Sequence, residues 1–357
     1  MASTDIDPDA LKRYSFTVWS YKQGEVVSLL IHLGDELGLY KIMAGAGPMT
    51  AADLAERTGL NERILREWLL GNAAAGLLER VDDGAYALSP EGVAVLADEE
   101  QSLFFSGGAF RGGFEPSLIA ALIDSFRTGI GVTYEQQGPR AAAGLARMTG
   151  PWSRLALTST ILPALDGVVA KLEAGGAAVD VGCGAGVTVC TIAAAYPEAQ
   201  VTGYDPSAIA IGQARERAAE AGLTNATFIE GGAEHIPAGT GADLVLTFDC
   251  LHDMPRPDKA MAAIRRAIAP DGTWLIKDIR SSGDFERDRR NPMLAMFYGF
   301  SVSSCLQSAM STPDGLGLGT LGLHPAKAEE MVRAAGFSSF VTHDFDDVAN
   351  LYYEVRV

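Results

Sequence analysis

The sequence predicts an α/β protein in which a seven-stranded, doubly wound sheet follows a mostly helical N-terminal domain. The chain has 357 residues, which exceeds the roughly 250–300 residues at which a single hydrophobic core stops growing, so we expect two domains. Helical periodicity dominates residues 1–100, whereas from residue 171 short apolar segments alternate with amphipathic ones, a pattern typical of parallel sheets covered by helices. We predict an N-terminal domain at 1–100, a helical connector contributing to a pocket at 101–170 and an α/β domain at 171–357.

The composition is that of a globular protein in a reducing compartment. Apolar residues make up 48% of the chain and charged residues 20%, which excludes wholesale disorder. The sequence has neither an apolar run of membrane-spanning length nor a signal peptide at its start. Its four cysteines form no C-x-x-C pair and have no histidine at zinc-finger spacing, so we expect no disulfide framework and no metal site. We therefore expect a cytoplasmic protein.

The N-terminal domain has the order helix, turn, helix, hairpin. Apolar residues recur at helical spacing over 29–40, and Thr50 to Asp53 forms a capping box before the next apolar run. Asn61 is the expected N-cap of a third helix, whose apolar stripe contains Ile64, Leu65, Trp68 and Leu69. Residues 77–87 then predict two short strands around a turn at 82–84. This order is typical of a winged helix.

Charge argues against DNA binding by this winged helix. The first 100 residues contain 17 acidic and 8 basic side chains, and the whole chain has a formal net charge of −17. A domain that reads a DNA groove usually carries the opposite sign, because phosphates repel an acidic surface. We therefore expect the winged helix to form a homodimer, with neither nucleic acid nor a membrane as partner.

The α/β domain is predicted from seven apolar segments separated by amphipathic ones. Strands are expected at 177–181, 200–204, 226–229, 243–248, 273–279, 338–345 and 352–357. Helices are expected between them, for example at 208–221, 258–268 and 327–335. Such alternation predicts a Rossmann-like sheet with helices on both faces.

A glycine-rich loop follows the first of these strands. Gly182, Gly184 and Gly186 lie at a strand-to-helix turn, where glycine lets the backbone turn sharply and lets a ligand approach the main chain. The dinucleotide fingerprint would need a glycine at position 187, which is valine here. Asp180 places a carboxylate just before the loop, which is unfavourable for a pyrophosphate and suits the ammonium group of an amino-acid ligand. These features indicate S-adenosylmethionine as the ligand.

A second carboxylate distinguishes this loop from a chance glycine pattern. Gly315, Gly317 and Gly319 repeat the spacing, but they do not follow a strand, so we interpret them as a flexible loop. After the first triplet, Asp205 closes the next strand, where a carboxylate can accept hydrogen bonds from both ribose hydroxyls. The alternative is that Asp205 only caps the helix that opens near Ser207.

With these motifs, residues 171–357 resemble the class I S-adenosylmethionine-dependent methyltransferases. The resemblance implies that the loop from Gly182 through Cys183 and Gly184 to Gly186 binds the methionine and ribose portions, that Asp205 holds the ribose and that Tyr204 lies near the adenine. It places residues 230–237 at the adenine loop, where Gly232 replaces the usual aspartate and leaves recognition to the backbone of Gly232 and Ala233. The whole chain is similar to bacterial small-molecule methyltransferases with an N-terminal winged helix used for dimerisation, and more distantly to winged-helix O-methyltransferases.

The same resemblance implies a general base. In the winged-helix O-methyltransferases a histidine followed by aspartate, just beyond the fourth strand, deprotonates the acceptor, and His252 and Asp253 occupy that place. Asp253 or Asp249 is expected to orient the imidazole, unless Asp249 faces the cofactor. The alternative is that His252 only fills space beside the cofactor or caps the following helix.

Aromatic residues are the candidates for the wall of a substrate pocket. We single out Trp19, Tyr134 and Tyr298. The predicted function is methylation of a small, aromatic or hydroxylated molecule, which yields S-adenosylhomocysteine. Two other hypotheses stay open: a regulator whose winged helix reads DNA while the second domain senses the cofactor, and a methyltransferase fold without activity.

Overall fold

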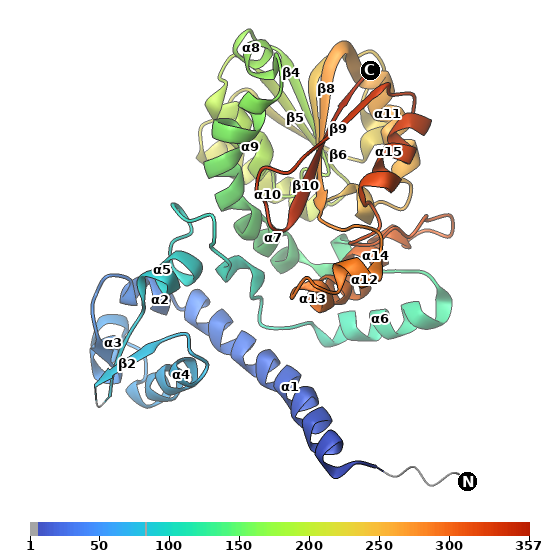
Figure 1. The fold of residues 1–357 in the computed structure, drawn as a ribbon. Helices are drawn as coiled ribbons and strands as arrows, with labels where there is room; N and C mark the ends of the chain where they lie inside the picture. Colours follow the sequence, from blue (N-terminus) through green and yellow to red (C-terminus); the bar gives the residue numbers. More distant parts are fainter. Residues whose placement is uncertain (1–5, 83) are drawn as a thin grey trace. The chain divides into compact units, whose positions relative to one another are not determined.

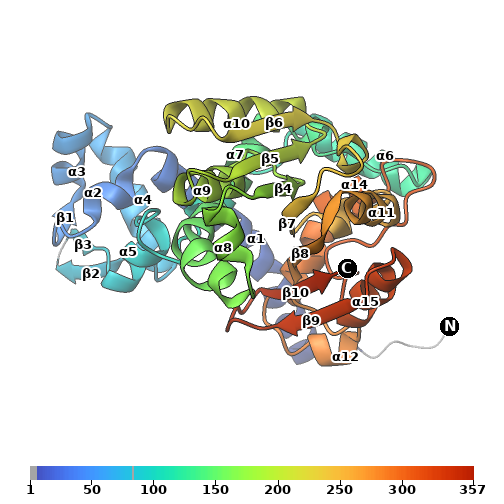
Figure 2. The same cartoon turned by 90° about the horizontal axis from the view of Figure 1, so that it is seen from above.

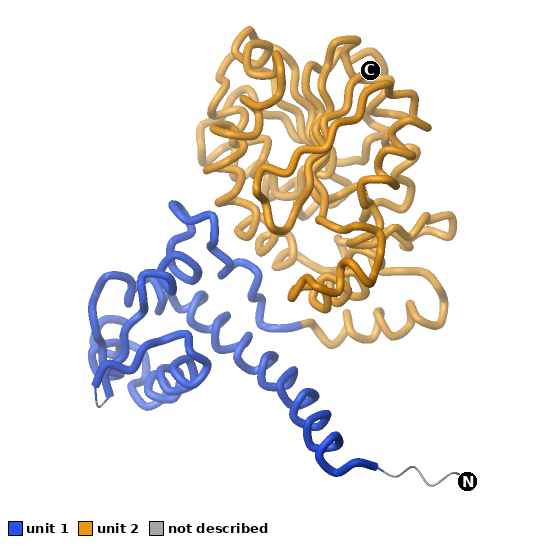
Figure 3. The backbone as a smooth tube through the Cα atoms, in the orientation of Figure 1, with its two compact units in different colours: residues 1–113 blue, residues 114–357 orange. Residues whose placement is uncertain are grey.

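The computed structural model describes residues 6–82 and 84–357 and divides the chain into two compact units, 1–113 and 114–357 (Figure 3). The first unit contains the helices α1 (Pro8–Glu36), α2 (Leu39–Met43), α3 (Ala51–Thr58), α4 (Glu62–Ala74) and α5 (Pro90–Leu96), the strands β1 (Met49–Thr50), β2 (Glu79–Asp82) and β3 (Ala85–Ala87), and the short η1 (Gly107–Ala109). The strands form a sheet in the order β1-β3-β2. This arrangement confirms the predicted winged helix, while Asp83 of its turn lies outside the described residues.

Local sequence signals set most of the boundaries in the first unit. Thr50 and Asp53 form the predicted capping box of α3, and the Asn61 side chain accepts a hydrogen bond from the backbone N–H of Ile64 at the start of α4. The helix expected at 29–40 differs, because Gly38 adopts φ +67° and separates α1 from α2. Ile64 also differs from the predicted apolar stripe, since it is 70% exposed, whereas Leu65, Trp68 and Leu69 are buried.

The second unit is built around a seven-stranded sheet with helices on both faces (Figure 1). Its strands are β4 (Ala177–Val181), β5 (Gln200–Asp205), β6 (Ala226–Glu230), β7 (Ala242–Phe248), β8 (Ile268–Ile279), β9 (Ser339–His343) and β10 (Asn350–Arg356). Their order is β6-β5-β4-β7-β8-β10-β9, and only the pairings of β10 are antiparallel (Figure 2). The predicted doubly wound sheet is confirmed.

Helices cover the two faces of this sheet and bury its apolar side chains, namely α8 (Val168–Glu173), α9 (Val187–Ala195) and α10 (Ala208–Glu220) in one core and α11 (Pro257–Ala267) and α15 (Pro325–Ala334) in the other. The second unit also contains α6 (Pro116–Thr128), α7 (Pro139–Trp152), α12 (Phe285–Asp288), α13 (Leu294–Phe300) and α14 (Leu306–Ala309). The short or π-helical turns are η2 (Glu135–Gln137), η3 (Ser153–Ile161), η4 (Leu162–Ala164), η5 (Ala233–His235), η6 (Leu251–Asp253) and η7 (Ser301–Cys305). One core lies on the side of α8 and α9, with Leu244 and Leu275, and the other on the side of α11 and α15, with Val245 and Trp274. The central strands β4 and β7 are therefore buried on both faces, which explains their nearly continuous apolar sequences.

The strand order reverses between β4 and β7, which both pair in parallel with their neighbours. In open α/β sheets the crevice at such a reversal, beyond the carboxyl ends of the strands, is where ligands bind. Two segments with predicted functional residues start there, the glycine loop after β4 and η6 after β7. No described helix is long and apolar enough to span a membrane.

Candidate active site

The glycine loop connects β4 to α9 and needs its glycines for two different reasons. Gly182, Gly184 and Gly186 all have positive φ, between +51° and +77°. A Cβ on Gly182 would lie 2.7 Å from Cys250 Cβ, and one on Gly186 would lie 2.7 Å from Phe228 Cε1, whereas a Cβ on Gly184 would meet nothing within 4 Å. Packing and backbone geometry thus require Gly182 and Gly186, and the space at Gly184 is open to a ligand.

Neighbouring strands hold this loop in place. The backbone N–H groups of Gly182 and Cys183 both donate to the carbonyl of Tyr204, at 2.8 and 3.0 Å. The N–H of Gly184 donates to Asp205 Oδ2 at 2.9 Å, and that of Ser207 donates to Asp205 Oδ1 at 2.9 Å. The structure therefore brings the predicted glycines, Tyr204 and Asp205 together, although the Tyr204 side chain is buried in the core.

The carboxylate of Asp180 is buried at the end of β4 beside the same loop. Burial, and then the charge of Asp205, raise the pKa of Asp180 from 3.8 to about 8. Burial also raises the pKa of Asp205, although hydrogen bonds from Ser207 and Gly184 oppose this rise. Among the described residues, Asp180 forms no ion pair with a lysine, arginine or histidine. A buried carboxylate of this kind favours a cationic ligand.

The loop after β6 contains the predicted adenine contacts. Gly232 precedes η5 and has an extended backbone, and the side chain of Ala233 is buried. A Cβ on Gly232 would lie 2.5 Å from Glu234 Oε2. The carboxylate of Glu234 therefore occupies space that a side chain at position 232 would take.

Asp249 directly follows β7, and its carboxylate contacts residues that the sequence analysis did not consider. It adopts φ +51°, its Oδ2 is 2.6 Å from Lys277 Nζ, and its Oδ1 accepts a hydrogen bond from the Asn350 amide at 2.5 Å. The Lys277 ammonium also lies 4.4 Å from the centre of the Trp152 ring. Asp249 therefore pairs with a buried lysine on β8 and does not orient His252.

Two carboxylates flank His252, which is 2% exposed. Its Nδ1 is 2.7 Å from Asp278 Oδ1, and its Nε2 is 3.1 Å from Asp253 Oδ1. Burial lowers the pKa of His252, but the charges and hydrogen bonds of Asp278 and Asp253 outweigh burial and raise it well above 6.5. The imidazole is thus held rigidly at the strand ends and is strongly basic.

Tyr134 joins this group of side chains. Its hydroxyl donates to Asp253 Oδ2 at 2.8 Å and lies 3.9 Å from Cys305 Sγ. Asp253 therefore links two side chains, with Oδ2 at the Tyr134 hydroxyl and Oδ1 3.1 Å from His252 Nε2. Ligand-type atoms of His252, Asp253 and Cys305 lie within 4.8 Å of one another, a spacing that a metal ion could use. The cluster therefore brings a histidine, a carboxylate, a phenol and a thiol together at the strand ends.

The other two predicted substrate residues lie on exposed surfaces. Trp19 is 68% exposed on α1, in the first unit, and Tyr298 is 45% exposed on α13. Tyr134, the third aromatic candidate, contacts the His252 cluster within the second unit.

Sequence reasoning missed Asp278, Lys277 and Glu135. Lys277 and Asp278 are consecutive polar residues directly after the apolar run 274–276 at the end of β8, which is the signal that could have identified them. Glu135 follows Tyr134, and its carboxylate accepts a hydrogen bond from the hydroxyl of Ser207.

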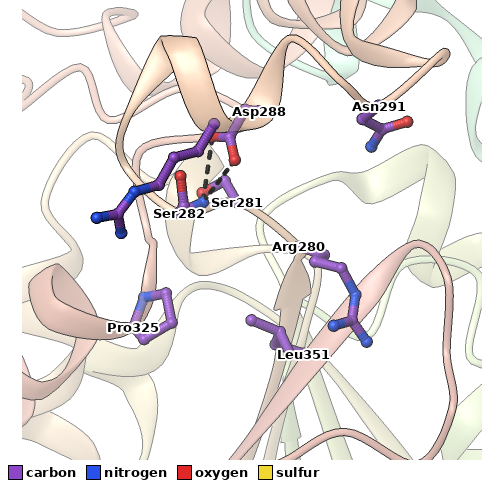
Figure 4. Close-up of a pocket in the computed structure, with 8 residues that line it drawn as sticks. Arg280, Ser281, Ser282, Asp288, Asn291, Pro325 and Leu351 are labelled. Carbon is purple, nitrogen blue, oxygen red and sulfur yellow. Dashed lines mark hydrogen bonds between the residues drawn. The ribbon is translucent and has the colours of Figure 1, made fainter.

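A separate pocket lies beyond β8 and contains no predicted site residue. It is lined by Arg280, Ser281, Ser282, Arg287, Asp288, Asn291, Pro325 and Leu351 (Figure 4). The Ser282 N–H donates to both oxygens of Asp288, at 3.0 and 3.1 Å, and Arg280 pairs with Asp344 at 2.6 Å. Asp288 thus binds the Ser282 backbone N–H in this pocket, and Asp344 pairs with Arg280. Because these acidic residues already pair with its donors, the pocket shows no preference for an anion.

Two family models match this chain. Residues 172–312 match a methyltransferase domain, and residues 25–98 match the Rv2258c-like winged HTH domain. The matched regions agree with the two folds described above, and together they favour an enzyme over a DNA-binding regulator.

Individual proteins extend the similarity over both domains. The mitomycin biosynthesis 6-O-methyltransferase of Streptomyces lavendulae is 27% identical over 279 residues, covering 73% of this chain and 76% of that protein. Trans-aconitate 2-methyltransferase of Rhodopseudomonas palustris is 34% identical over 99 residues, but these cover only 28% of this chain and 37% of that protein. The structure of human N-acetylserotonin methyltransferase in complex with S-adenosylmethionine has a TM-score of 0.67 at 20% identity and covers 100% of this chain and 99% of that one. This last likeness confirms the fold.

Proposed function

We propose that this chain, an S-adenosylmethionine-dependent methyltransferase with an N-terminal winged-helix domain, methylates a hydroxyl group of a small molecule with His252 as general base. The observation that carries the proposal is the buried His252 between two carboxylates, 2.7 Å from Asp278 and 3.1 Å from Asp253. An O-methyltransferase relative supports oxygen as the acceptor. Aromatic and hydroxylated compounds are the substrate class that we infer.

The residues of the glycine loop fit the cofactor. Open space at Gly184 admits a ligand to the backbone, and the buried carboxylate of Asp180 suits the ammonium group of the methionine portion. The two carboxylate oxygens of Asp205 accept hydrogen bonds from the backbone N–H groups of Gly184 and Ser207. These bonds fix the carboxylate in an orientation in which ribose hydroxyls can also donate to it. When bound, S-adenosylmethionine supplies an electrophilic methyl group on a sulfonium.

Glu234 is our candidate for the missing adenine acceptor. Its carboxylate lies where a side chain at position 232 would be, 2.5 Å from the ideal Cβ position. An acidic group there can accept a hydrogen bond from the exocyclic amine of adenine, as an aspartate at position 232 would. Glu234 thereby offsets the loss of a side chain at Gly232.

The protein's part in the reaction is to remove a proton and to orient the acceptor. Asp278 accepts a hydrogen bond from His252 Nδ1–H, so once the pH exceeds the raised pKa of His252 the neutral imidazole has its lone pair at Nε2. With the cofactor bound, the acceptor hydroxyl would give its proton to Nε2, and its oxygen would take the methyl group as the carbon–sulfur bond breaks and S-adenosylhomocysteine leaves. Asp278 and Asp253 stabilise the resulting imidazolium, and Tyr134 keeps Asp253 in place through a 2.8 Å hydrogen bond.

Exposed aromatic side chains on α1, in the first unit, support a homodimer as the form in solution. Tyr14, Phe16, Trp19 and Tyr21 on α1 are each at least 68% exposed, and apolar surface of this kind is typical of an interface. A second copy of the chain is the partner that we propose, in the cytoplasm. Light scattering after size exclusion tests this, and a monomer at micromolar concentration would contradict it.

His252→Ala tests the central proposal. We expect turnover with a hydroxylated acceptor to fall by about 10²- to 10⁴-fold, which is the usual contribution of a general base, while S-adenosylhomocysteine binds as in the wild type. His324→Ala, at a histidine that caps α15, is the matched control. Acceptors are found by incubating the enzyme and labelled cofactor with extracts of its host. Unchanged turnover in His252→Ala would remove this residue from the mechanism.

A further inference from the structure

The connector contains a ten-residue loop, 129–138, between α6 and α7. Glycines with positive φ stand at both ends, Gly129 at +72° and Gly138 at +80°. Within the second unit, Gly131 N–H donates to the Met310 carbonyl at 2.9 Å, and the Gln137 amide donates to Ser304 Oγ at 2.9 Å. The loop is therefore anchored to the helices that follow β8.

Two consecutive side chains of this loop contact two different parts of the site. Tyr134 donates to Asp253, the neighbour of His252, at 2.8 Å. Glu135 accepts a hydrogen bond from Ser207 Oγ in the turn after β5. The loop thus lies against both the proposed base and the proposed ribose-binding turn.

Glu135 and Asp205 share Ser207 as a hydrogen-bond donor. The backbone N–H of Ser207 donates to Asp205 Oδ1 at 2.9 Å, and the hydroxyl donates to Glu135. The charge of Glu135 contributes to the raised pKa of Asp205, after burial. Two neighbouring carboxylates in a partly buried site are unfavourable by themselves, and they become favourable when a ligand donates hydrogen bonds to them.

We propose that Glu135 is a cofactor-binding residue, which accepts a hydrogen bond from a ribose hydroxyl beside Asp205. It comes from the connector, outside the segment that matches the methyltransferase domain. This inference rests on the proposed function, because it takes the ribose to bind at Asp205. In the competing explanation, Glu135 only orients Ser207, whose hydroxyl caps α10 by accepting from the Ala210 N–H at 3.2 Å.

Calorimetric titration with three ligands distinguishes the two explanations. The ligands are S-adenosylhomocysteine and its 2′-deoxy and 3′-deoxy analogues, and the proteins are the wild type, Glu135→Gln and the control Glu220→Gln, at an exposed position on α10. Glutamine still accepts from Ser207 but loses the charge. A hydrogen bond to a charged group is worth about 10- to 100-fold in affinity.

We expect Glu135→Gln to bind S-adenosylhomocysteine about 10- to 100-fold more weakly than the wild type and the control do. With the deoxy analogue that lacks the bonded hydroxyl, all three proteins should bind equally. Equal affinity of Glu135→Gln and wild type for S-adenosylhomocysteine would overturn the inference alone, as would the same loss for all three ligands. Wild-type protein that binds none of them would overturn the proposed function itself.

Discussion

Replacing Asp180 by asparagine should change how the stability of the ligand-free protein depends on pH. The side chain keeps its size but can no longer ionise. In the folded protein, burial and then Asp205 raise the pKa of Asp180 to about 8, compared with 3.8 in a solvated chain. A carboxyl group whose pKa is raised by folding stabilises the protein below the unfolded pKa, and this contribution is lost as the pH rises through the folded pKa.

The size of the effect follows from these two pKa values. Between them the folded protein binds one more proton than the unfolded chain, so the free energy of unfolding falls by about 1.4 kcal/mol per pH unit. Between pH 6 and pH 9 Asp180 should therefore remove roughly 2–3 kcal/mol of stability, with most of the change below pH 8. His252, whose pKa is also raised, changes stability in the same direction, so only the difference between variant and wild type isolates Asp180.

Urea unfolding at pH 6, 7, 8 and 9 measures this difference. We expect wild type and the exposed control Glu220→Gln to lose stability in parallel, while Asp180→Asn loses about 2–3 kcal/mol less over the range. Asp180→Asn should also bind S-adenosylhomocysteine more weakly, because it lacks the carboxylate for the ammonium group. A variant whose stability falls as steeply with pH as that of the wild type would refute the reasoning.

Two further predictions concern the base and the adenine. Asp278→Asn should shift the acid limb of the pH profile of kcat to lower pH, because His252 loses a charge that raises its pKa while burial still lowers it; a pH profile measured beside Asp258→Asn checks this, and an unmoved limb would contradict it. Glu234→Ala should weaken binding of S-adenosylhomocysteine by about 2- to 10-fold, because water screens a hydrogen bond to this largely exposed carboxylate, and adding Gly232→Asp should restore it. If titration finds that Glu234→Ala binds as the wild type does, the adenine acceptor is elsewhere.

Signals that act over a few residues predicted the strands of the sheet, several helix caps and the glycine loop. The caps at Thr50 and Asn61, the seven strands and the strand-to-helix turn at Gly182 all depend on neighbours within one turn or one strand. Asp205 could also be placed, since the parallel pairing of β5 with β4 brings the two carboxyl ends together. Gly38 and Ile64 differ from the prediction, because the positive φ of Gly38 separates α1 from α2 and the Ile64 side chain is exposed.

Contacts between distant segments could not be read from the chain. Asp278 reaches His252 because β7 and β8 pair in a register that brings their carboxyl ends together, and Glu135 reaches Ser207 across 72 residues of sequence. The sequence by itself thus determined the winged helix, the seven-stranded sheet, and the closeness of the glycine loop to Asp205. Tertiary structure alone decided the pairing of His252 with Asp278, of Asp249 with Lys277 and of Ser207 with Glu135, because hydrogen bonds and buried charges depend on distances in space that local periodicity does not encode.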